Sequence, residues 1–288
     1  MKDLNYQLMK LCKANRDGSY STQATRRRIL DRIANQLHAL GYKHMQAKSL
    51  KPKHVEALVS LWKDQGLSTG TLKNLLSGLR WWARHIGKPD IIPKSNDAFD
   101  IGKRSQVAEE SKAWELKEAH LARISDEYVA LSLRLQSAFG LRREEAIKFR
   151  PGYAIKADHI KLKASWTKGG RARSVPIRTD EQRQLLEDVR KLAPGGALIP
   201  SNKNYEEQLH RYERQVRTAG IRNPHGLRHA YAQRRYEELT GWKAPVAGGP
   251  ASQSLTIEQR ALIWGARVTV AQELGHSREQ ISARYLGR

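Results

Sequence analysis

Apolar side chains recur at helical spacing along the first part of the chain. Three sets repeat every three to four positions: Ile29, Ile33, Leu37 and Leu40; Val55, Leu58, Val59 and Trp62; and Leu72, Leu75, Leu76, Leu79 and Ile86. Each set covers one face of a predicted helix, and the last two follow the start signals Pro52 and Ser68-Thr69. With a shorter helix over residues 4–15, the pattern predicts a compact bundle of about four helices.

The helical pattern breaks after this bundle. Pro89 and Pro93 lie in the break, and the basic, turn-like segment Gly102-Lys103-Arg104-Ser105 follows them. A helical pattern resumes from about Trp114 to Lys148. The predicted organisation is therefore an N-terminal helical domain, a basic linker and a second domain, over residues 1–90, 91–112 and 113–288.

Within the second domain the period of the pattern changes to two. Ile160, Leu162, Ala164 and Trp166 alternate with polar residues, which is typical of a half-buried strand. Gly169-Gly170 predicts a turn, and the alternation continues beyond it, so we predict an antiparallel hairpin with Lys168 at its tip. Helices are predicted after the hairpin, near residues 180–192, 205–219, 225–240 and 268–285.

Residues 241–267 form an insertion between the last two of these helices. Its first half is loop-like, whereas apolar residues from Thr256 to Ala266 recur at helical spacing, with Thr256 as the predicted N-cap. Gly275 is a predicted C-cap, and a short helix is expected to begin near Ser277. The chain is therefore predicted to be mainly α-helical, with a small antiparallel β-hairpin in an α+β second domain.

The chain carries a large excess of positive charge. Its 52 Lys and Arg against 29 Asp and Glu give a net charge of +23 over 288 residues, with a pI near 10.3. Such a charge favours a polyanion as the partner. A basic membrane-surface protein is the alternative, but the sequence has neither an amphipathic basic helix with a clean apolar face nor a lipidation site.

The number of cysteines and the hydropathy of the chain indicate the cellular compartment in which the protein acts. Cys12 is the only cysteine, so an intramolecular disulfide and a thiolate metal site are excluded. The N-terminal segment is too polar for a signal peptide, and no apolar run approaches membrane-spanning length. We therefore expect a cytoplasmic, nucleoid-associated protein without a membrane partner.

Two arginines and two histidines stand at spacings that favour a phosphate site. Arg142 precedes Glu145 by three positions, where the carboxylate can hold a guanidinium or an amide. A guanidinium in a cleft offers a planar fork that fits two phosphate oxygens. His225, Arg228 and His229 share one helical face, and a histidine at a helix N-terminus is held neutral and can accept a proton. Zinc is the alternative ligand, but the arginine between the histidines disfavours a metal.

Three further residues complete the set. Lys168 is an exposed cation that can protonate a leaving alkoxide, His276 follows Leu274-Gly275, and Tyr285 lies on the expected short helix. Singly, each has an ordinary structural explanation. Their order along the chain supplies the groups needed to hold a phosphodiester, attack it and protonate its leaving oxygen.

This series resembles the tyrosine recombinase (phage integrase) family, whose pattern is Arg…Lys…His-x-x-Arg…His/Trp…Tyr. Every position holds the expected residue type, and Leu274-Gly275-His276-Ser277 followed by a tyrosine is the most specific part. The resemblance implies these roles: Tyr285 as nucleophile, Arg142 and Arg228 as the clamp on the scissile phosphate, His276 as its hydrogen-bond donor, His225 as a group that helps take the tyrosine proton, Lys168 as proton donor to the 5′ oxygen, and Glu145 and His229 as supporting residues.

The resemblance also implies a reaction and its partners. DNA would be cut and rejoined through a covalent 3′-phosphotyrosine, without a metal or a nucleotide cofactor. Double-stranded DNA and a homo-tetramer on paired sites are the expected partners, and an accessory DNA-bending or directionality protein is a further candidate. Five basic residues are candidate DNA contacts: Arg26, Arg27 and Arg28 in the second helix, and Lys103 and Arg104 in the linker.

Two features depart from the family pattern. Only Leu286, Gly287 and Arg288 follow Tyr285, whereas the family usually continues into a segment that docks on a neighbouring subunit. The segment between Arg228 and His276 is also longer than usual, because of residues 241–267. We expect the insertion to make subunit contacts in place of the tail; the alternative is that its helix covers its own domain.

Integration or excision of a mobile element is the function that this evidence favours. Chromosome- or plasmid-dimer resolution by the same chemistry is an alternative, and so is a catalytically inactive DNA-binding protein. An RNA-associated basic protein would explain the charge but not the ordered series.

Overall fold

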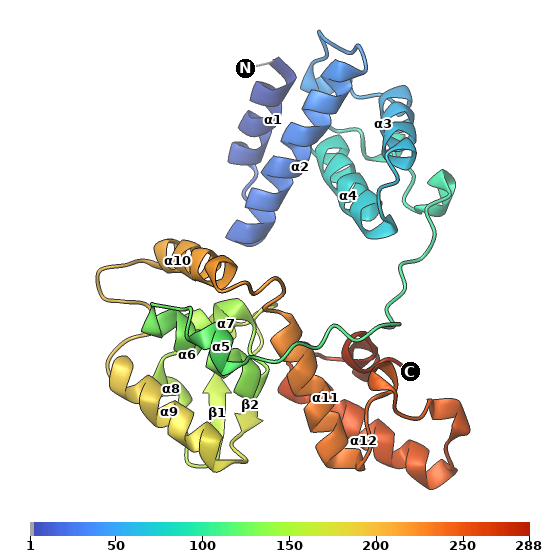
Figure 1. The fold of residues 1–288 in the computed structure, drawn as a ribbon. Coiled ribbons are helices and arrows are strands. Elements are labelled where there is room, and N and C mark those ends of the chain that lie inside the picture. Colours follow the sequence, from blue (N-terminus) through green and yellow to red (C-terminus); the bar gives the residue numbers. More distant parts are fainter. Residues whose placement is uncertain (1–2) are drawn as a thin grey trace. The chain divides into compact units, whose positions relative to one another are not determined.

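The computed structural model describes residues 3–288, which form two compact units. The first unit extends to Ser105 and the second begins at Gln106, so the division lies inside the stretch predicted as a linker. Each unit has its own hydrophobic core. The mainly helical fold with one antiparallel pair of strands was predicted from the sequence and is confirmed (Figure 1).

The first unit is a bundle of four α-helices. These are α1 (Asp3–Ala14), α2 (Tyr20–Ala39), α3 (Pro52–Asp64) and α4 (Thr69–His85). Ser19 and Ser68 cap α2 and α4, each accepting a hydrogen bond from a backbone N–H three residues on. Trp62 and Trp82 are fully buried between the helices, and Ile101 after α4 packs into the same core.

The second unit contains nine further α-helices and one hairpin among the described residues. In chain order they are α5 (Glu118–Leu121), α6 (Glu127–Phe139), α7 (Arg143–Ile147), α8 (Pro151–Ala154), β1 (His159–Leu162), β2 (Arg173–Pro176), α9 (Asp180–Leu192), α10 (Tyr205–Thr218), α11 (Gly226–Thr240), α12 (Ile257–Glu273) and α13 (Ala283–Leu286). α11 packs against α6, α12 and α13, which brings the later helices together (Figure 1).

Gly140 ends α6 with a left-handed backbone at φ 62°. A Cβ at this position would lie 2.5 Å from the ring of Tyr231 on α11. Only glycine therefore satisfies both the turn and the close approach of α11. The break also separates α6 from α7, so the single helical pattern from Trp114 to Lys148 is divided between α5, α6 and α7.

The hairpin is shorter than the sequence pattern indicates. β1 pairs antiparallel with β2 from His159 opposite Pro176 to Leu162 opposite Arg173. The predicted strand over Ala164 and Trp166 is wrong, because these residues form a 3₁₀ turn that buries the indole. Lys168 lies in the exposed turn between this element and β2.

The insertion and the following helix are continuous. Thr256 caps α12 as predicted, but α12 runs without a break to Glu273, so the predicted helix start near residue 268 is wrong. Apolar side chains of α12 extend the core along its length, and Ile263 and Val270 are buried. A short 3₁₀ turn at Pro245–Ala247 contacts α13, so part of the insertion covers its own domain.

Candidate active site

Arg228 lies at the centre of the predicted site. Its side chain is on the first turns of α11 and is 1% exposed. The guanidinium donates to the carbonyl oxygens of Gly140 at the end of α6 and Leu274 at the end of α12. Its Nε lies 3.3 Å from the hydroxyl oxygen of Tyr285. Burial lowers the pKa of Arg228 to about 10, which keeps it cationic at neutral pH.

Three predicted histidines surround the ring of Tyr285. The ring centroids lie 4.6 Å from it for His229, 5.7 Å for His276 and 6.3 Å for His225. Tyr285 is 6% exposed and belongs to the one-turn helix α13. The fold thus brings together residues that lie about sixty positions apart, as the ordered series predicts.

The surroundings keep these histidines neutral. Burial, with His225 and nearby cations next in order, lowers the pKa of His229 to about 4. Burial, followed by Arg228 and Arg142, lowers that of His276 to about 3. The pKa of His225 is also lowered, first by partial burial and then by the same two arginines. Among the described residues, Nδ1 of His229 and Nε2 of His276 have no hydrogen-bond partner.

Glu145 holds two arginines beside this cluster. Its carboxylate accepts Nη1 of Arg142 at 2.8 Å, and also the Arg142 backbone N–H at 2.7 Å. Arg173 donates two hydrogen bonds to the same carboxylate, at 2.8 and 2.7 Å. Glu145 is fully buried, and the three arginines outweigh the effect of burial and lower its pKa to about 2. The predicted contact of Glu145 with a neighbouring guanidinium and amide is therefore present.

Arg173 is a site residue that the sequence reasoning missed. It lies on β2, and its Nε donates to the carbonyl oxygen of Glu273 at 2.8 Å. It therefore joins the hairpin to Glu145 and to the end of α12, just before His276. The sequence pattern could have indicated it. Arg173 stands two positions before the buried Val175, so both side chains lie on the inward face of β2.

Lys168 stands apart from these contacts. It is exposed in the hairpin turn, between the 3₁₀ turn at Ala164–Trp166 and β2. After burial and the two arginines, its charge also contributes to the lowered pKa of His225. The structure thus leaves this cation outside the buried cluster, on a turn that solvent can reach.

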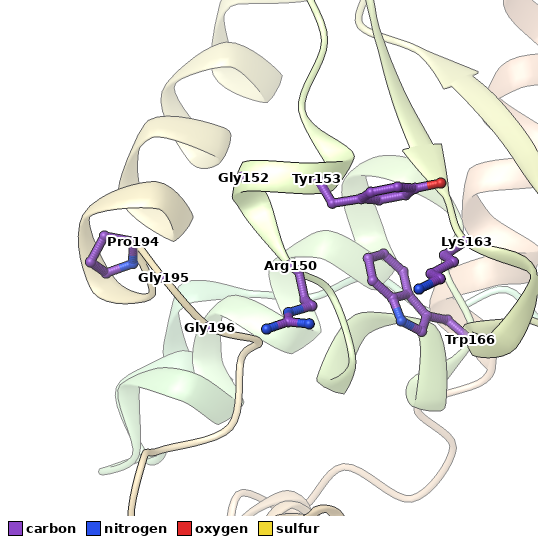
Figure 2. A pocket seen from close by; sticks show the side chains of 8 residues that line it. All are labelled: Arg150, Gly152, Tyr153, Lys163, Trp166, Pro194, Gly195 and Gly196. Carbon is purple, nitrogen blue, oxygen red and sulfur yellow. The ribbon is translucent and has the colours of Figure 1, made fainter.

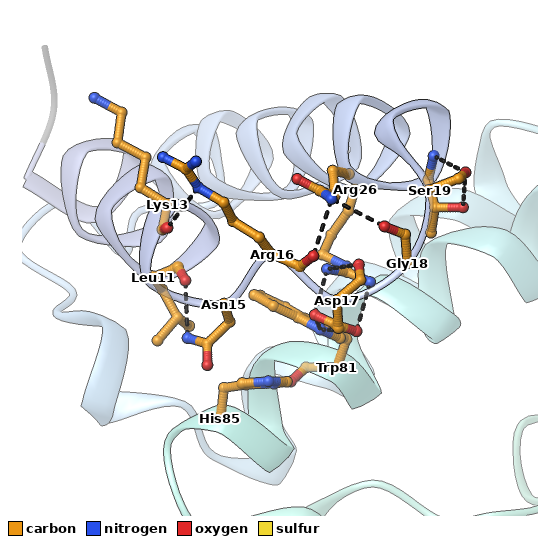
Figure 3. A network of polar contacts seen from close by, with 12 residues as sticks. Leu11, Lys13, Asn15, Arg16, Asp17, Gly18, Ser19, Arg26, Trp81 and His85 are labelled. Atoms are coloured by element: carbon orange, nitrogen blue, oxygen red, sulfur yellow. Dashed lines mark hydrogen bonds and ion pairs between the residues drawn. The ribbon is translucent and has the colours of Figure 1, made fainter.

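The candidate DNA contacts in the first unit have different surroundings. Arg26 forms a two-pronged ion pair with Asp17, at 2.8 and 2.9 Å, and its guanidinium lies 4.3 Å from the ring centroid of Trp81 (Figure 3). Its side chain is only 11% exposed, so it is engaged within the bundle. Arg27 and Arg28 are exposed on α2. The other two candidates, Lys103 and Arg104, are also exposed.

A separate cavity of about 380 Å³ lies beside the hairpin (Figure 2). Arg150, Tyr153, Lys163 and Trp166 line it, and the rings of Tyr153 and Trp166 meet edge to face at 5.4 Å. None of the predicted catalytic side chains lines this cavity. Tyr285 and the predicted histidines lie around Arg228 instead.

Two structural findings concern metals and membranes. Residues 3–288 contain no group of three or more His, Cys, Asp or Glu side chains that could hold a metal ion. Within the same residues, no helix combines the length and apolarity needed to cross a membrane.

Two sequence families match successive parts of the chain. The family described as "Phage integrase, N-terminal" matches residues 1–92, and the family described as "Integrase" matches residues 100–234. Together they cover most of the sequence, including Arg142, Lys168 and Arg228. The chain belongs to the phage integrase, or tyrosine recombinase, family. By family it is a tyrosine site-specific recombinase, an enzyme that breaks and rejoins DNA.

Solved structures share the fold of this recombinase. A lambda integrase dimer bound to a core site matches with a TM-score of 0.63 and 17% identity, over 98% of this chain and 76% of that one. The XerH site-specific recombinase bound to its difH substrate matches with a TM-score of 0.57 and 19% identity, over 99% of this chain and 81% of that one. The Tn1549 transposon integrase in complex with circular intermediate DNA matches with a TM-score of 0.56 and 15% identity, over 100% of this chain and 96% of that one. A sequence search among curated proteins gives no match.

Replacing Glu145 with Gln should destabilise the recombinase strongly. The change leaves Arg142 and Arg173 without their shared counter-charge, which costs about 3–5 kcal/mol for a buried ion pair. The free energy of unfolding in urea measures the effect. Glu144→Gln is the matched control, because Glu144 pairs with Lys148 at the surface and its loss should cost less than about 1 kcal/mol. Equal losses in both variants would contradict the importance of the buried carboxylate.

The stability of the recombinase should fall as the pH drops from about 6.5 towards 4. In the folded state the pKa values of His229 and His276 lie near 4 and 3, below the ordinary value of 6.5. In this window the unfolded chain binds protons that the folded chain does not, so protonation favours unfolding. Urea midpoints across the pH range measure the slope. His276→Gln should have a shallower slope; an unchanged slope would contradict the assignment.

Proposed function

We propose that the recombinase cleaves double-stranded DNA with Tyr285 as the nucleophile and rejoins it through a 3′-phosphotyrosine. The observation that carries this proposal is the 3.3 Å distance between the Tyr285 hydroxyl and Nε of the buried Arg228. A buried guanidinium beside a phenol provides positive charge where a phosphoryl group would meet its attacking oxygen.

Arg228 and Arg142 would bind the scissile phosphate. Two backbone carbonyls fix the plane of Arg228, so its orientation is set before DNA binds. Arg142 uses Nη1 for Glu145, and its side chain is 19% exposed, which leaves further N–H groups for a phosphate oxygen. His276 would donate a third hydrogen bond from its unpartnered Nε2. These donors are in place before reaction, which lowers the cost of stabilising the transition state.

Proton transfer would use His225 and Lys168. His225 lies directly before the first turn of α11, and its lowered pKa favours the neutral imidazole that can accept the tyrosine proton. His229 is 8% exposed and packs on the ring of Tyr285, which suits a supporting role. Lys168, on its exposed turn, would protonate the departing 5′ oxygen. The covalent intermediate conserves the energy of the phosphodiester, so rejoining needs no nucleotide.

The distribution of charge supports a DNA clamp. The net charge of +23 favours a polyanionic partner, and Arg27, Arg28, Lys103 and Arg104 are exposed to solvent, where they can contact one. Arg26 would contribute through the packing of α2 rather than directly, because Asp17 and Trp81 already engage it. Phosphate contacts of this kind position the protein and do not select the sequence.

We further propose that the biological task is integration or excision of a mobile element. The matched families are described as phage integrase and integrase, and the Tn1549 and lambda proteins are named integrases. Dimer resolution is the second candidate, because XerH, named a site-specific recombinase, has a similar fold. Recombination between two plasmids, compared with that between direct repeats on one plasmid, tests the choice. Reaction only within one plasmid would favour resolution.

The recombinase would act as a homo-tetramer on paired sites. One similar structure is a lambda integrase tetramer bound to a Holliday junction. In the present chain the insertion leaves three large apolar side chains of α12 exposed: Ile257 at 80%, Leu262 at 46% and Trp264 at 63%. Such residues are costly to leave in water, and a second copy of the chain is the partner that we propose for them.

Tyr285→Phe should retain DNA binding and lose cleavage. The ring and its packing against His229 remain, and only the nucleophilic oxygen is removed. The substrate is a pool of nicked duplexes of random sequence, from which the wild-type chain captures its own site as an adduct that resists denaturant. The variant should form no detectable adduct, whereas Tyr153→Phe, which changes a partly exposed tyrosine, should react normally. An adduct with Tyr285→Phe would assign the chemistry to another nucleophile.

Replacing both Ile257 and Trp264 with Ser should separate assembly from chemistry. Because the two side chains project from α12 into solvent, the variant should fold and cleave nicked half-sites at the wild-type rate. It should fail to form the four-subunit complex on full sites, as measured by light scattering. Tyr6→Ser, which removes an exposed aromatic of the first unit, is the control. Normal assembly of the double variant would end the proposal for this surface.

A further inference from the structure

The helix that carries Tyr285 depends on contacts from outside itself. α13 spans only Ala283–Leu286, and a single helical turn is unstable in isolation. Inside the turn, the Gly287 backbone N–H donates to the carbonyl oxygen of Ala283 at 3.1 Å. The position of the nucleophile is therefore set by the elements that bind this turn.

Gln233 binds the main chain of the nucleophile. Its Nε2 donates to the carbonyl oxygen of Tyr285 at 3.0 Å, and its side chain is buried on α11. This carbonyl lies at a helix end, where no partner within the helix is available. α11 therefore holds Tyr285 at both ends, with Arg228 at the hydroxyl and Gln233 at the backbone.

The segment that begins the second unit binds the same helix. The Ala108 backbone N–H donates to the carbonyl oxygen of Ala283 at 3.0 Å, and the Arg284 guanidinium donates to the side chain of Gln106. Ser111 completes the contact, because its hydroxyl bonds both amide atoms of Gln233, at 3.0 and 3.1 Å. We name residues 106–111 the strap.

The chain directly after the strap is anchored beside His225. The Trp114 backbone N–H donates to the carbonyl oxygen of Gly226 at 3.2 Å, just after His225. A Cβ on Gly226 would lie 2.7 Å from the carbonyl oxygen of Lys112, so a glycine permits the close approach. The chain is thus held at α13 by the strap and at the start of α11 by the residues that follow it, Lys112 and Trp114.

We propose that Gln233 is a positioning residue for Tyr285, and that Ser111 of the strap acts on the nucleophile through Gln233. The proposal rests on the proposed role of Tyr285. The strap follows directly after Ser105, the last residue of the first unit. The strap therefore contacts the main chain around Tyr285 through hydrogen bonds that involve neither Arg142 nor Arg228.

These contacts set the position of the Tyr285 hydroxyl relative to the scissile phosphate, and so affect the cleavage rate. Displacement of a reacting atom by about 1 Å can cost on the order of 100-fold in rate. Loss of the Gln233 contact frees the carbonyl end of Tyr285, while Arg228 still contacts its hydroxyl. DNA affinity, which depends on phosphate contacts elsewhere, is unaffected.

Single-turnover cleavage by the full chain tests the proposal, with the nicked duplex captured by the wild-type protein as substrate. Gln233→Leu keeps the size of the side chain and removes its hydrogen bonds. It lowers the rate of adduct formation at saturating protein roughly tenfold to 100-fold, with an unchanged half-saturating concentration. Ser111→Ala causes a smaller loss, and Ser111→Thr, which keeps the hydroxyl, restores the wild-type rate. Ser201→Ala, at another exposed serine, is the control.

The double variant tests the order of action. If Ser111 acts through Gln233, Ser111→Ala causes no further loss in the Gln233→Leu background. An equal further loss would overturn that link, and a wild-type rate for Gln233→Leu would overturn the positioning role. If the melting temperature shows that Gln233→Leu is unfolded, the variants at position 111 test the proposal instead. Equal rates for Ser111→Ala and Ser111→Thr would then overturn it. Failure of the wild-type chain to form any adduct would instead refute the proposed function.

Discussion

The buried guanidinium of Arg228 is the interaction on which the second unit depends. It joins the end of α6, the end of α12 and the phenol of α13 to one side chain of α11. A buried cation must be hydrogen-bonded, or it destabilises the fold. Three separate segments meet this need, so the requirement that keeps the arginine stable also assembles the site.

Glu145 balances the charge that this arrangement creates. Arg142, Arg173 and Arg228 all lower the pKa of its carboxyl, and it is the one fully buried carboxylate beside them among the described residues. A single negative charge among three arginines leaves a net positive site. A phosphate can complete the balance, because it brings the missing negative charge without displacing the carboxylate. Burial, together with the same positive field, keeps the neighbouring histidines neutral and available as hydrogen-bonding groups.

The helical bundle and the ordered series were predictable, because both depend on local patterns. Apolar spacing located α2, α3 and α4, and short-range signals such as Thr256 located caps. Arg173 and Gln233 were missed because their partners lie far away in sequence. Arg173 meets Glu145 across 28 positions, and Gln233 meets the Tyr285 carbonyl across 52. The alternation over Ala164 and Trp166 led to a wrong strand prediction, because apolar and polar residues can also alternate in a buried 3₁₀ turn.

The sequence by itself determined most of the helices, the net charge, the family and the types of residue at the site. Each of these follows from side-chain chemistry or from spacing along the chain. The tertiary structure decided which groups share a charge, which histidines are buried, and which contacts hold Tyr285. These properties depend on distances between segments, and the strength of an electrostatic or hydrogen-bonding contact falls steeply with distance. The contact between the strap and α13 therefore could not be predicted from the sequence, because it depends on the tertiary structure that brings residues 106–111 next to α13.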